Sequence, residues 1–534
     1  CGGDAPDLAG ALGTITSTDL AAHIQILASD SFEGRAPSSP GEEKTINYLK
    51  RVFEEYRLRP GNGDTFFQEV PLVSITASPN ATLSVSGGGV TNRYRYGTDF
   101  MAWTLRVVER SELSNSEMVF VGYGVVAPEY DWNDYEGSEV TGKTVVMLVN
   151  DPGFATEDTA LFNGRAMTYY GRWTYKFEEA ARQGAAGALI VHETEPAAYP
   201  WDVVASSWSG PQFGLVSADD NMSRAAVEGW ITVETAREIF AQAGRDYDEL
   251  KEQAAQRGFR AAPLELTASL SLRNSIERST SNNVLAVLPG TDRADEYVVY
   301  MAHWDHFGRD TTLEGDQIYN GALDNATGTA GLIELAQAFA SLEQRPRRSL
   351  LFLAVAAEEQ GLLGSLHYAT NPVYPLEKTV AAINMDGLNI LGPMRDITVV
   401  GYGNSELDDY LADAAGTQDR VLRPDPEPEK GFYYRSDHFS FAKQGVPALY
   451  ADAGIDHVIH GEEWTLAQRD EYTNKNYHKP SDEYDPSWDL SGAVDDLRLL
   501  FRVGYRLANE SYFPNWSEGT EFRALRDSMM AEAH

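Results

Sequence analysis

Four short polar motifs between residues 300 and 387 constrain the fold of this chain more than any other feature. Three of them directly follow apolar, strand-like runs, at 297–301, 350–355 and 379–383. Because the carboxyl ends of parallel strands meet along one edge of an α/β sheet, this placement predicts such a sheet with a site at that edge. The motifs are Ala302-His303-Trp304-Asp305-His306, Gly321-Ala322-Leu323-Asp324-Asn325, Ala357-Glu358-Glu359-Gln360-Gly361 and Asn384-Met385-Asp386-Gly387.

Strand-like and helix-like segments alternate through the surrounding region. Apolar residues at helical spacing predict helices at 330–342, 405–415 and 490–509. Further strands are predicted at 284–288, 397–400 and 446–450. This alternation is typical of an α/β fold with a doubly wound, mostly parallel sheet.

The segment 117–272 differs in character from the chain around it. It has its own strands and helices, and no metal-ligand cluster is visible in its sequence. We therefore predict a smaller α/β domain inserted into a host domain. The predicted organisation is a tether at 1–17, the first part of the host domain at 18–116, the insert at 117–272, the second part at 273–512 and a tail at 513–534.

The charge of the chain excludes one class of partner. Its 534 residues include 43 Lys and Arg against 80 Asp and Glu, which gives a formal net charge of -37. Binding to nucleic acid needs a basic surface, so we predict no nucleic-acid partner. Adhesion to anionic lipid is disfavoured for the same reason. No stretch approaches the ~20 apolar residues of a membrane-spanning helix, so no transmembrane segment is predicted.

Cys1 is the only cysteine. An intramolecular disulfide is therefore impossible, and a buried metal site must use nitrogen and oxygen ligands. One interpretation of Cys1, followed by Gly2-Gly3-Asp4, is the lipidated first residue of a bacterial lipoprotein. It predicts a lipid anchor and a location in the cell envelope, on the periplasmic side or the outer membrane, or else secretion. The alternative is a chance start of the sequence.

The motifs together provide the ligands for two zinc ions. Each ion needs about four or five ligands, and a bridging carboxylate would hold the ions about 3.5–4 Å apart. Taken singly, each motif also resembles a helix cap, a tight turn or a charged surface pair. Together, and with the later motif at 476–480, they favour a metal site. The expected ligands are His303, Asp324, Glu359, Asp386 and His478.

Three further residues fit roles around such a site. A zinc-activated water needs a base, and Glu358 stands beside a ligand. Asp305 could accept the other ring N–H of His303. Tyr477, next to His478, could donate to a developing oxyanion. The remaining histidines, among them His306, His457 and His460, are weaker candidates.

These motifs resemble those of the di-zinc aminopeptidases and glutamate carboxypeptidases of metallopeptidase family twenty-eight, clan MH. The family pattern of His-x-Asp, Asp-Asn-(Ala/Gly)-x-Gly, Glu-Glu-x-Gly-x-x-Gly-Ser, Asp-x-x-Gly and Tyr-His is matched. The matching positions are His303 and Asp305, Asp324 to Gly328, Glu358 to Ser365, Asp386, and Tyr477-His478. Two further motifs, Phe32-Glu33-Gly34-Arg35 and Ser436-Asp437-His438, also resemble sequences of this family. The insert resembles a protease-associated domain.

The resemblance implies a zinc-exopeptidase fold and assigns roles. Asp324 would bridge two Zn²⁺ ions, His303 and Asp386 would complete one, and Glu359 and His478 the other. Glu358 would act as general base and acid, with help from Tyr477. The inserted domain would shape substrate access, with Arg172 as one candidate. From its place in Ser436-Asp437-His438-Phe439, and not from the resemblance, we expect His438 to line the substrate cleft or to lock its loop instead of binding metal.

We expect a zinc aminopeptidase that acts on peptides, and three alternatives remain open. A carboxypeptidase acting on acidic C-termini would need arginines such as Arg435 and Arg172 to clamp a carboxylate. A glutaminyl-cyclase-like acyltransferase would use one zinc, and a receptor-like protein would use none. We expect a monomer, because little chain follows His478 to form the helical dimerisation domain of the carboxypeptidase relatives.

Overall fold

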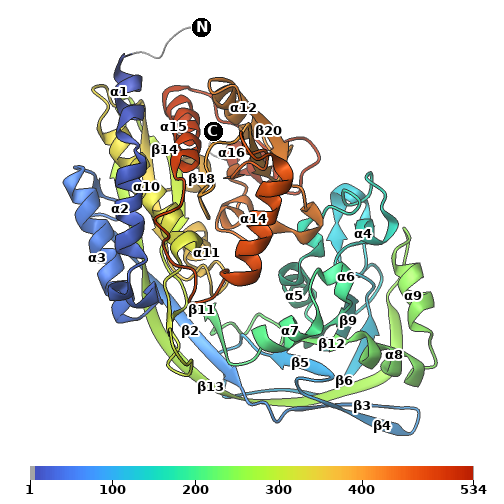
Figure 1. Cartoon of the computed structure of the whole chain (residues 1–534). Coiled ribbons are helices and arrows are strands. Elements are labelled where there is room, and N and C mark those ends of the chain that lie inside the picture. Colours follow the sequence, from blue (N-terminus) through green and yellow to red (C-terminus); the bar gives the residue numbers. More distant parts are fainter. Residues whose placement is uncertain (1–5, 533–534) are drawn as a thin grey trace. The chain divides into compact units, whose positions relative to one another are not determined.

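The computed structural model describes residues 6–532 and divides into two compact units (Figure 1). The first unit contains the chain up to residue 70, then 280–426 and the chain from 435 onward. The second contains 71–279 and 427–434. Cys1, and with it the predicted lipid anchor, lies outside the described residues. Within the described range, no helix combines the length and apolarity that a membrane span requires.

Four parallel strands form the centre of the sheet of the first unit. In spatial order they are β17 (Arg348–Val355), β14 (Arg293–His303), β18 (Thr379–Asn384) and β21 (Ala448–Asp452). All residues of β17 and β18 are buried, as expected of parallel strands covered on both faces. Antiparallel neighbours extend the sheet, with β13 (Ala262–Leu288) beside β17 and β19 (Asp396–Val400) beside β21.

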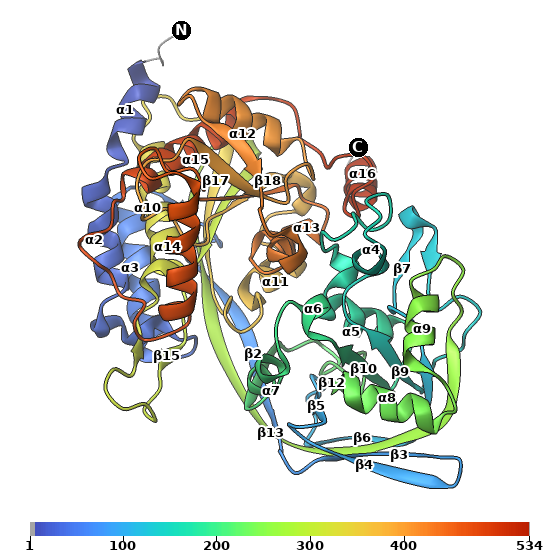
Figure 2. The ribbon, with the colours of Figure 1, turned by 45° about the vertical axis from the view of Figure 1, so that its right-hand side comes forward.

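Helices cover both faces of this sheet, which confirms the predicted α/β class. Figure 2 shows α10 (Gly328–Ala340) and α15 (Ser491–Asn509) on one side of β17 and β18, with α11 (Leu363–Thr370) and α13 (His438–Ala442) on the other.

The contact between α15 and the sheet is fixed by a hydrogen bond. The Tyr300 hydroxyl on β14 donates to the Leu500 carbonyl at 2.7 Å. Gly504 leaves room for this ring, since a methyl group there would overlap the Tyr300 hydroxyl.

Within the described residues, the segments near both ends of the chain contain helices that the sequence analysis did not predict. The predicted tether contains α1 (Pro6–Thr14), whose Ala11 and Leu12 are buried and which packs against α10. The predicted tail contains α16 (Arg523–Glu532), which follows the fully buried Trp516. Small or scattered apolar residues make these short helices hard to recognise, because tertiary packing supplies most of their stability.

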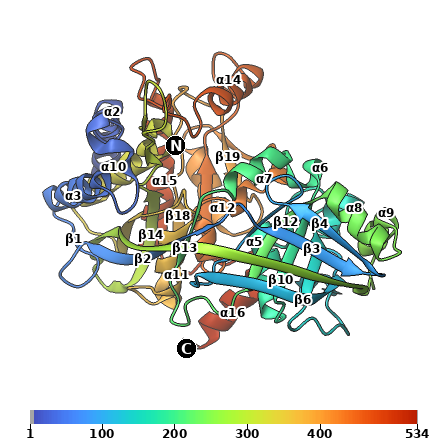
Figure 3. The same cartoon turned by 90° about the horizontal axis from the view of Figure 1, so that it is seen from below.

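The second unit has its own sheet, seen from below in Figure 3. Its parallel strands are β6 (Arg110–Phe120), β9 (Thr144–Leu148), β10 (Gly187–His192) and β12 (Val227–Thr232). The helices α5 (Trp173–Arg182) and α8 (Val233–Gln242) pack on these strands. Buried aromatic residues such as Trp103 and Trp230 fill its core.

Residues 71–116 lie in this second unit, although the sequence analysis grouped them with the host domain. The physical reason is strand pairing. The strand β3 (Thr82–Gly87) pairs with the first part of β13, and β5 (Phe100–Trp103) pairs with β12. These partners lie far along the chain, so periodicity alone does not reveal them.

Candidate metal centre

Four predicted site residues lie together because the three strands that carry them are neighbours. His303 is the last residue of β14, Glu358 and Glu359 follow the end of β17, and Asp386 follows the end of β18. Both β17 and β18 pair in parallel with β14, with His303 opposite Val355. The carboxyl edge of the sheet therefore gathers these side chains, as the sequence predicted.

Two loops supply the other predicted ligands. Asp324 lies in the turn η4 (Ala322–Thr327) that precedes α10, and its backbone is not helical (φ -110°, ψ 95°). His478 follows α14 (Glu462–Lys475) in a left-handed conformation with φ 57°. The helix α14 was not recognised from sequence, because only Thr465 among its residues is buried and no apolar face marks it.

The distances between these side chains fit a pair of metal ions. His303 Nε2 lies 3.3 Å from Asp324 Oδ1 and 3.2 Å from Asp386 Oδ1. His478 Nε2 lies 3.2 Å from Asp324 Oδ2 and 3.3 Å from Glu359 Oε2. Tetrahedral zinc with bonds of about 2.0–2.1 Å separates its ligand atoms by about 3.3–3.4 Å.

Hydrogen bonding alone does not explain this arrangement. One ring nitrogen carries at most one proton, which cannot point well at two oxygens in different directions. Each Nε2 of His303 and His478 is nevertheless placed almost equally far from two carboxylate oxygens. Asp324 directs one oxygen at each imidazole, as a carboxylate between two cations would. The donor set therefore fits two zinc ions.

The orientation of His303 is fixed by its other ring nitrogen. Nδ1 donates to the backbone carbonyl of Asp305 at 3.2 Å, whereas the Asp305 carboxylate lies 3.9 Å away. The expected contact with Asp305 is therefore made, by its backbone carbonyl rather than by its side chain. Asp305 Oδ1 instead accepts the backbone N–H of Glu358 at 3.1 Å. Asp305 thus connects the loop of His303 to that of Glu358. Because its carbonyl binds Nδ1, the other ring nitrogen of His303, Nε2, faces the carboxylates.

The electrostatics of the centre favour added positive charge. Burial, together with the negative charges of Asp386 and Asp437, raises the pKa of the Glu358 carboxyl well above its usual range. Burial acts to raise the pKa of Asp324 as well, but hydrogen bonds from His303 and His478 outweigh it and hold that pKa well below its usual range. Carboxyl groups buried together repel one another, and cations or protons must compensate them.

Sequence reasoning missed two side chains that contact the expected ligands. His306 Nδ1 shares a hydrogen bond of 2.5 Å with Glu359 Oε1, and burial lowers the pKa of His306 to about 3. Ser436 Oγ donates to Asp386 Oδ2 at 2.6 Å. The position of His306 in the first motif and that of Ser436 in Ser436-Asp437-His438 were usable signals, although neither residue was assigned this contact.

The remaining predicted residues occupy different positions. Tyr477 is 44% exposed and its ring stacks on His478 at a centroid distance of 3.7 Å. His438 is fully buried at the start of α13, with its ring 5.0 Å from that of Tyr450. Arg435 belongs to the same unit and directly precedes Ser436. Arg172 belongs to the second unit, at the N-terminal end of α5.

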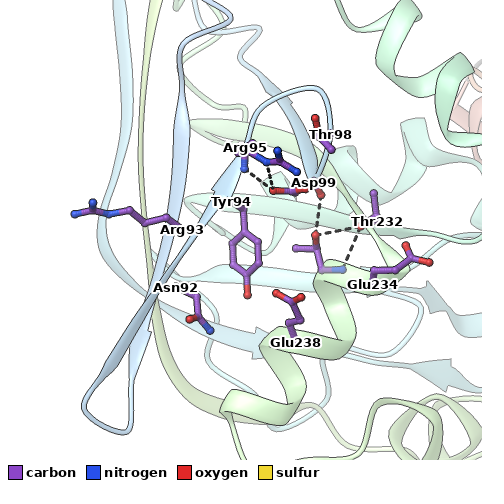
Figure 4. Close-up of a pocket in the computed structure, with 10 residues that line it drawn as sticks. Asn92, Arg93, Tyr94, Arg95, Thr98, Asp99, Thr232, Glu234 and Glu238 are labelled. Carbon is purple, nitrogen blue, oxygen red and sulfur yellow. Dashed lines mark hydrogen bonds and ion pairs between the residues drawn. The ribbon is translucent and has the colours of Figure 1, made fainter.

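A separate cavity of about 460 Å³ lies in the second unit (Figure 4). It is formed by residues of β4 (Val90–Arg95) and the start of α8, and Arg93, Arg95 and Glu238 give it mixed charge. Its lining residues include none of the predicted site residues. The cavity is therefore distinct from the centre at the edge of the sheet.

Comparison with known proteins identifies a family that the region carrying this centre matches, and relatives that match part of the chain. A model of the family described as Peptidase family M28 matches residues 283–501. Aminopeptidase NAALADL1 of Mus musculus is 36% identical over 129 residues, which make up 23% of this chain and 16% of the mouse protein. Glutamate carboxypeptidase 2 homolog of Caenorhabditis elegans is 30% identical over 123 residues, 22% of this chain and 14% of that protein. This chain thus spans only a small part of the length of either relative.

One solved structure shares the fold over nearly the whole chain. An aminopeptidase from Aneurinibacillus sp. strain AM-1 aligns with a TM-score of 0.51 at 20% identity. The alignment covers 94% of this chain and 96% of that one. At this level of identity the likeness concerns the fold and not the substrate.

Proposed function

We propose that this chain, whose residues 283–501 match the model of peptidase family M28, is a zinc-dependent exopeptidase, and specifically an aminopeptidase. The observation that carries the proposal is the position of Asp324. Its two carboxylate oxygens lie 3.3 and 3.2 Å from the Nε2 atoms of His303 and His478. In this proposal His303, Asp324 and Asp386 would hold one zinc ion, and His478, Asp324 and Glu359 would hold the other.

Zinc bound in this centre would polarise a peptide carbonyl and lower the pKa of a water molecule. The protein residues then move the protons. Glu358 accepts the proton of the attacking water and returns it to the amine that leaves. The Asp305 carboxylate accepts a hydrogen bond from the backbone N–H of Glu358. This bond fixes the backbone from which the Glu358 side chain extends. Tyr477, stacked on His478, donates to the developing oxyanion.

The charge balance of the centre supports an aminopeptidase over a carboxypeptidase. Two zinc ions would supply four positive charges, and the buried guanidinium of Arg35 adds a fifth nearby. If all six carboxyl groups of the centre are ionised when zinc is bound, their negative charges exceed these positive charges. The six groups are those of Asp305, Asp324, Glu358, Glu359, Asp386 and Asp437. An acidic excess attracts the ammonium group of a peptide N-terminus and repels a free C-terminal carboxylate.

The test is hydrolysis of one peptide in three forms: free at both ends, N-acetylated, and C-amidated. Each form is incubated with the protein, with and without a chelator. We expect cleavage of the free and amidated forms, no cleavage of the acetylated form, and loss of all cleavage with the chelator. The opposite preference would establish a carboxypeptidase. Absence of chelator-sensitive cleavage in every form would refute the exopeptidase proposal.

A further inference from the structure

The turn 320–324, which ends in Asp324 and overlaps the start of η4, is held on one side by a buried cation. The Arg35 side chain is 1% exposed and donates four hydrogen bonds, all to backbone carbonyl oxygens. Two acceptors belong to this turn: Nη1 donates to the Asn320 carbonyl at 2.7 Å and Nη2 to the Gly321 carbonyl at 2.8 Å. A third bond joins Nε to the carbonyl of Trp304, the residue after His303, at 2.9 Å.

The same turn is held on its other side by a buried anion. Asp482 is 1% exposed, and its Oδ1 and Oδ2 accept the backbone N–H groups of Leu323 and Asp324, each at 3.1 Å. Its own carbonyl accepts the N–H of Ala322 at 3.0 Å. Successive backbone N–H groups of this kind form a binding site for an anion. Asp482 is held in turn by the Tyr472 hydroxyl on α14, which donates a hydrogen bond to Asp482 Oδ2 at 3.1 Å.

We propose that Arg35 and Asp482 are positioning residues that clamp the turn 320–324, so that Asp324 presents its two oxygens at the spacing that two zinc ions require. The cation binds the carbonyls at the start of the turn and the anion binds the N–H groups at its end. The inference rests on the proposed function, because it assigns the clamp to the proposed zinc centre.

The contacts connect the three chain segments that carry the imidazole and bridging ligands. Arg35 joins the turn to the segment of His303 through the Trp304 carbonyl. Asp482 joins the turn to the segment of His478, which lies four residues earlier. Charge-assisted hydrogen bonds are stronger than neutral ones, and residues that orient metal ligands tune metal affinity. The clamp therefore holds the ligand atoms without contacting the metal.

The test measures zinc affinity and melting temperature in four single variants and one double variant. Asp482→Asn removes the charge with little change of shape, Arg35→Lys keeps the charge but loses the planar fork, and Tyr472→Phe removes one supporting hydroxyl. Arg348→Lys is the matched control. Arg348 is a fully buried arginine of the same unit that donates to Glu296 and to the Leu507 carbonyl, away from the centre.

We expect Asp482→Asn and Arg35→Lys to weaken zinc binding by about 10–100-fold in competition with a chromophoric chelator. Tyr472→Phe should have a smaller effect in the same direction. The increase in melting temperature that zinc produces should shrink in these variants. The control should melt earlier both with and without zinc while its zinc affinity stays within twofold of the wild type. The double variant Arg35→Lys, Asp482→Asn should lose less affinity than the product of the single losses, because both residues act on one turn.

Wild-type zinc affinity in Asp482→Asn and Tyr472→Phe would overturn the inference, even if both variants melted earlier, because the contacts would then serve folding alone. If Arg35→Lys does not fold, these two variants decide the question. A wild-type protein that binds no zinc would refute the proposed function itself. Normal zinc binding in the wild type, unchanged in the variants, would refute only the clamp.

Discussion

Replacing Glu358 by Gln separates the chemistry of this centre from its assembly. Glu358 can present an oxygen in a group with His303 and Asp386 whose ligand atoms all lie within 4.8 Å of one another. Its backbone N–H is held by the Asp305 carboxylate at 3.1 Å. Gln has the same size and keeps the same backbone contact, but it cannot accept a proton from water. The fold and the metal ligands should therefore survive the change.

The expected magnitude follows from the proposed role of Glu358 as the proton acceptor. A positioned general base contributes about 10²- to 10⁴-fold to rate. That range corresponds to about 2.7–5.5 kcal/mol of transition-state stabilisation. We expect kcat of the Glu358→Gln variant to fall by this factor. KM should change little, because no proposed zinc ligand is removed.

The assay combines steady-state hydrolysis of the preferred peptide with elemental analysis of zinc per chain. Glu359→Gln is the matched control, because Glu359 is the neighbouring residue and its Oε2 lies 3.3 Å from His478 Nε2. Glu358→Gln should keep two zinc ions per chain with little activity, whereas Glu359→Gln should lose zinc together with activity. Retained kcat in Glu358→Gln would remove Glu358 from the role of base. Loss of zinc in that variant would instead make Glu358 a ligand.

Three further predictions address the bridge, a buried acid and the packing of the sheet. Asp324→Asn should reduce bound zinc from two ions to at most one, measured after dialysis, and two retained ions would argue against a bridging role. Burial raises the pKa of Glu334 to about 8. The folded state therefore holds a proton that the unfolded state releases near pH 4.5, and stability falls as the pH rises from about 4.5 to 8. Glu334→Gln should thus melt at a higher temperature than the wild type at pH 8 and at a similar temperature at pH 4, whereas a gap independent of pH would contradict this account. Gly504→Ala should cost about 1–3 kcal/mol, because the new methyl group would overlap the Tyr300 hydroxyl. The added change Tyr300→Phe should recover part of the lost melting temperature, and no recovery would place the strain elsewhere.

Local patterns were sufficient to predict the centre of the fold. The apolar runs of β14, β17 and β18 are visible in the sequence because parallel strands are buried on both faces. His303 ends its strand, and the acidic residues Glu358 and Asp386 follow theirs. The class of sheet and the edge that carries the centre follow from these short-range features.

Long-range placement was decided by the tertiary structure. Strand pairing with β12 and β13 puts residues 71–116 in the second unit. Packing, and not propensity, orders the helices α1 and α16 near the chain ends. The contact of His303 with the carbonyl of Asp305, instead of its carboxylate, depends on a loop conformation that periodicity does not describe.

The sequence by itself determined which residue types stand at the ends of the strands, and hence that a site rich in His and carboxylate lies there. Only the tertiary structure decided how those groups face one another and what holds them. Arg35 meets the Trp304 carbonyl across 269 positions of the chain, and Asp482 meets the Asp324 N–H across 158. Strand and helix patterns arise from neighbouring residues, whereas such contacts arise only when the whole core closes and buried charges must find partners.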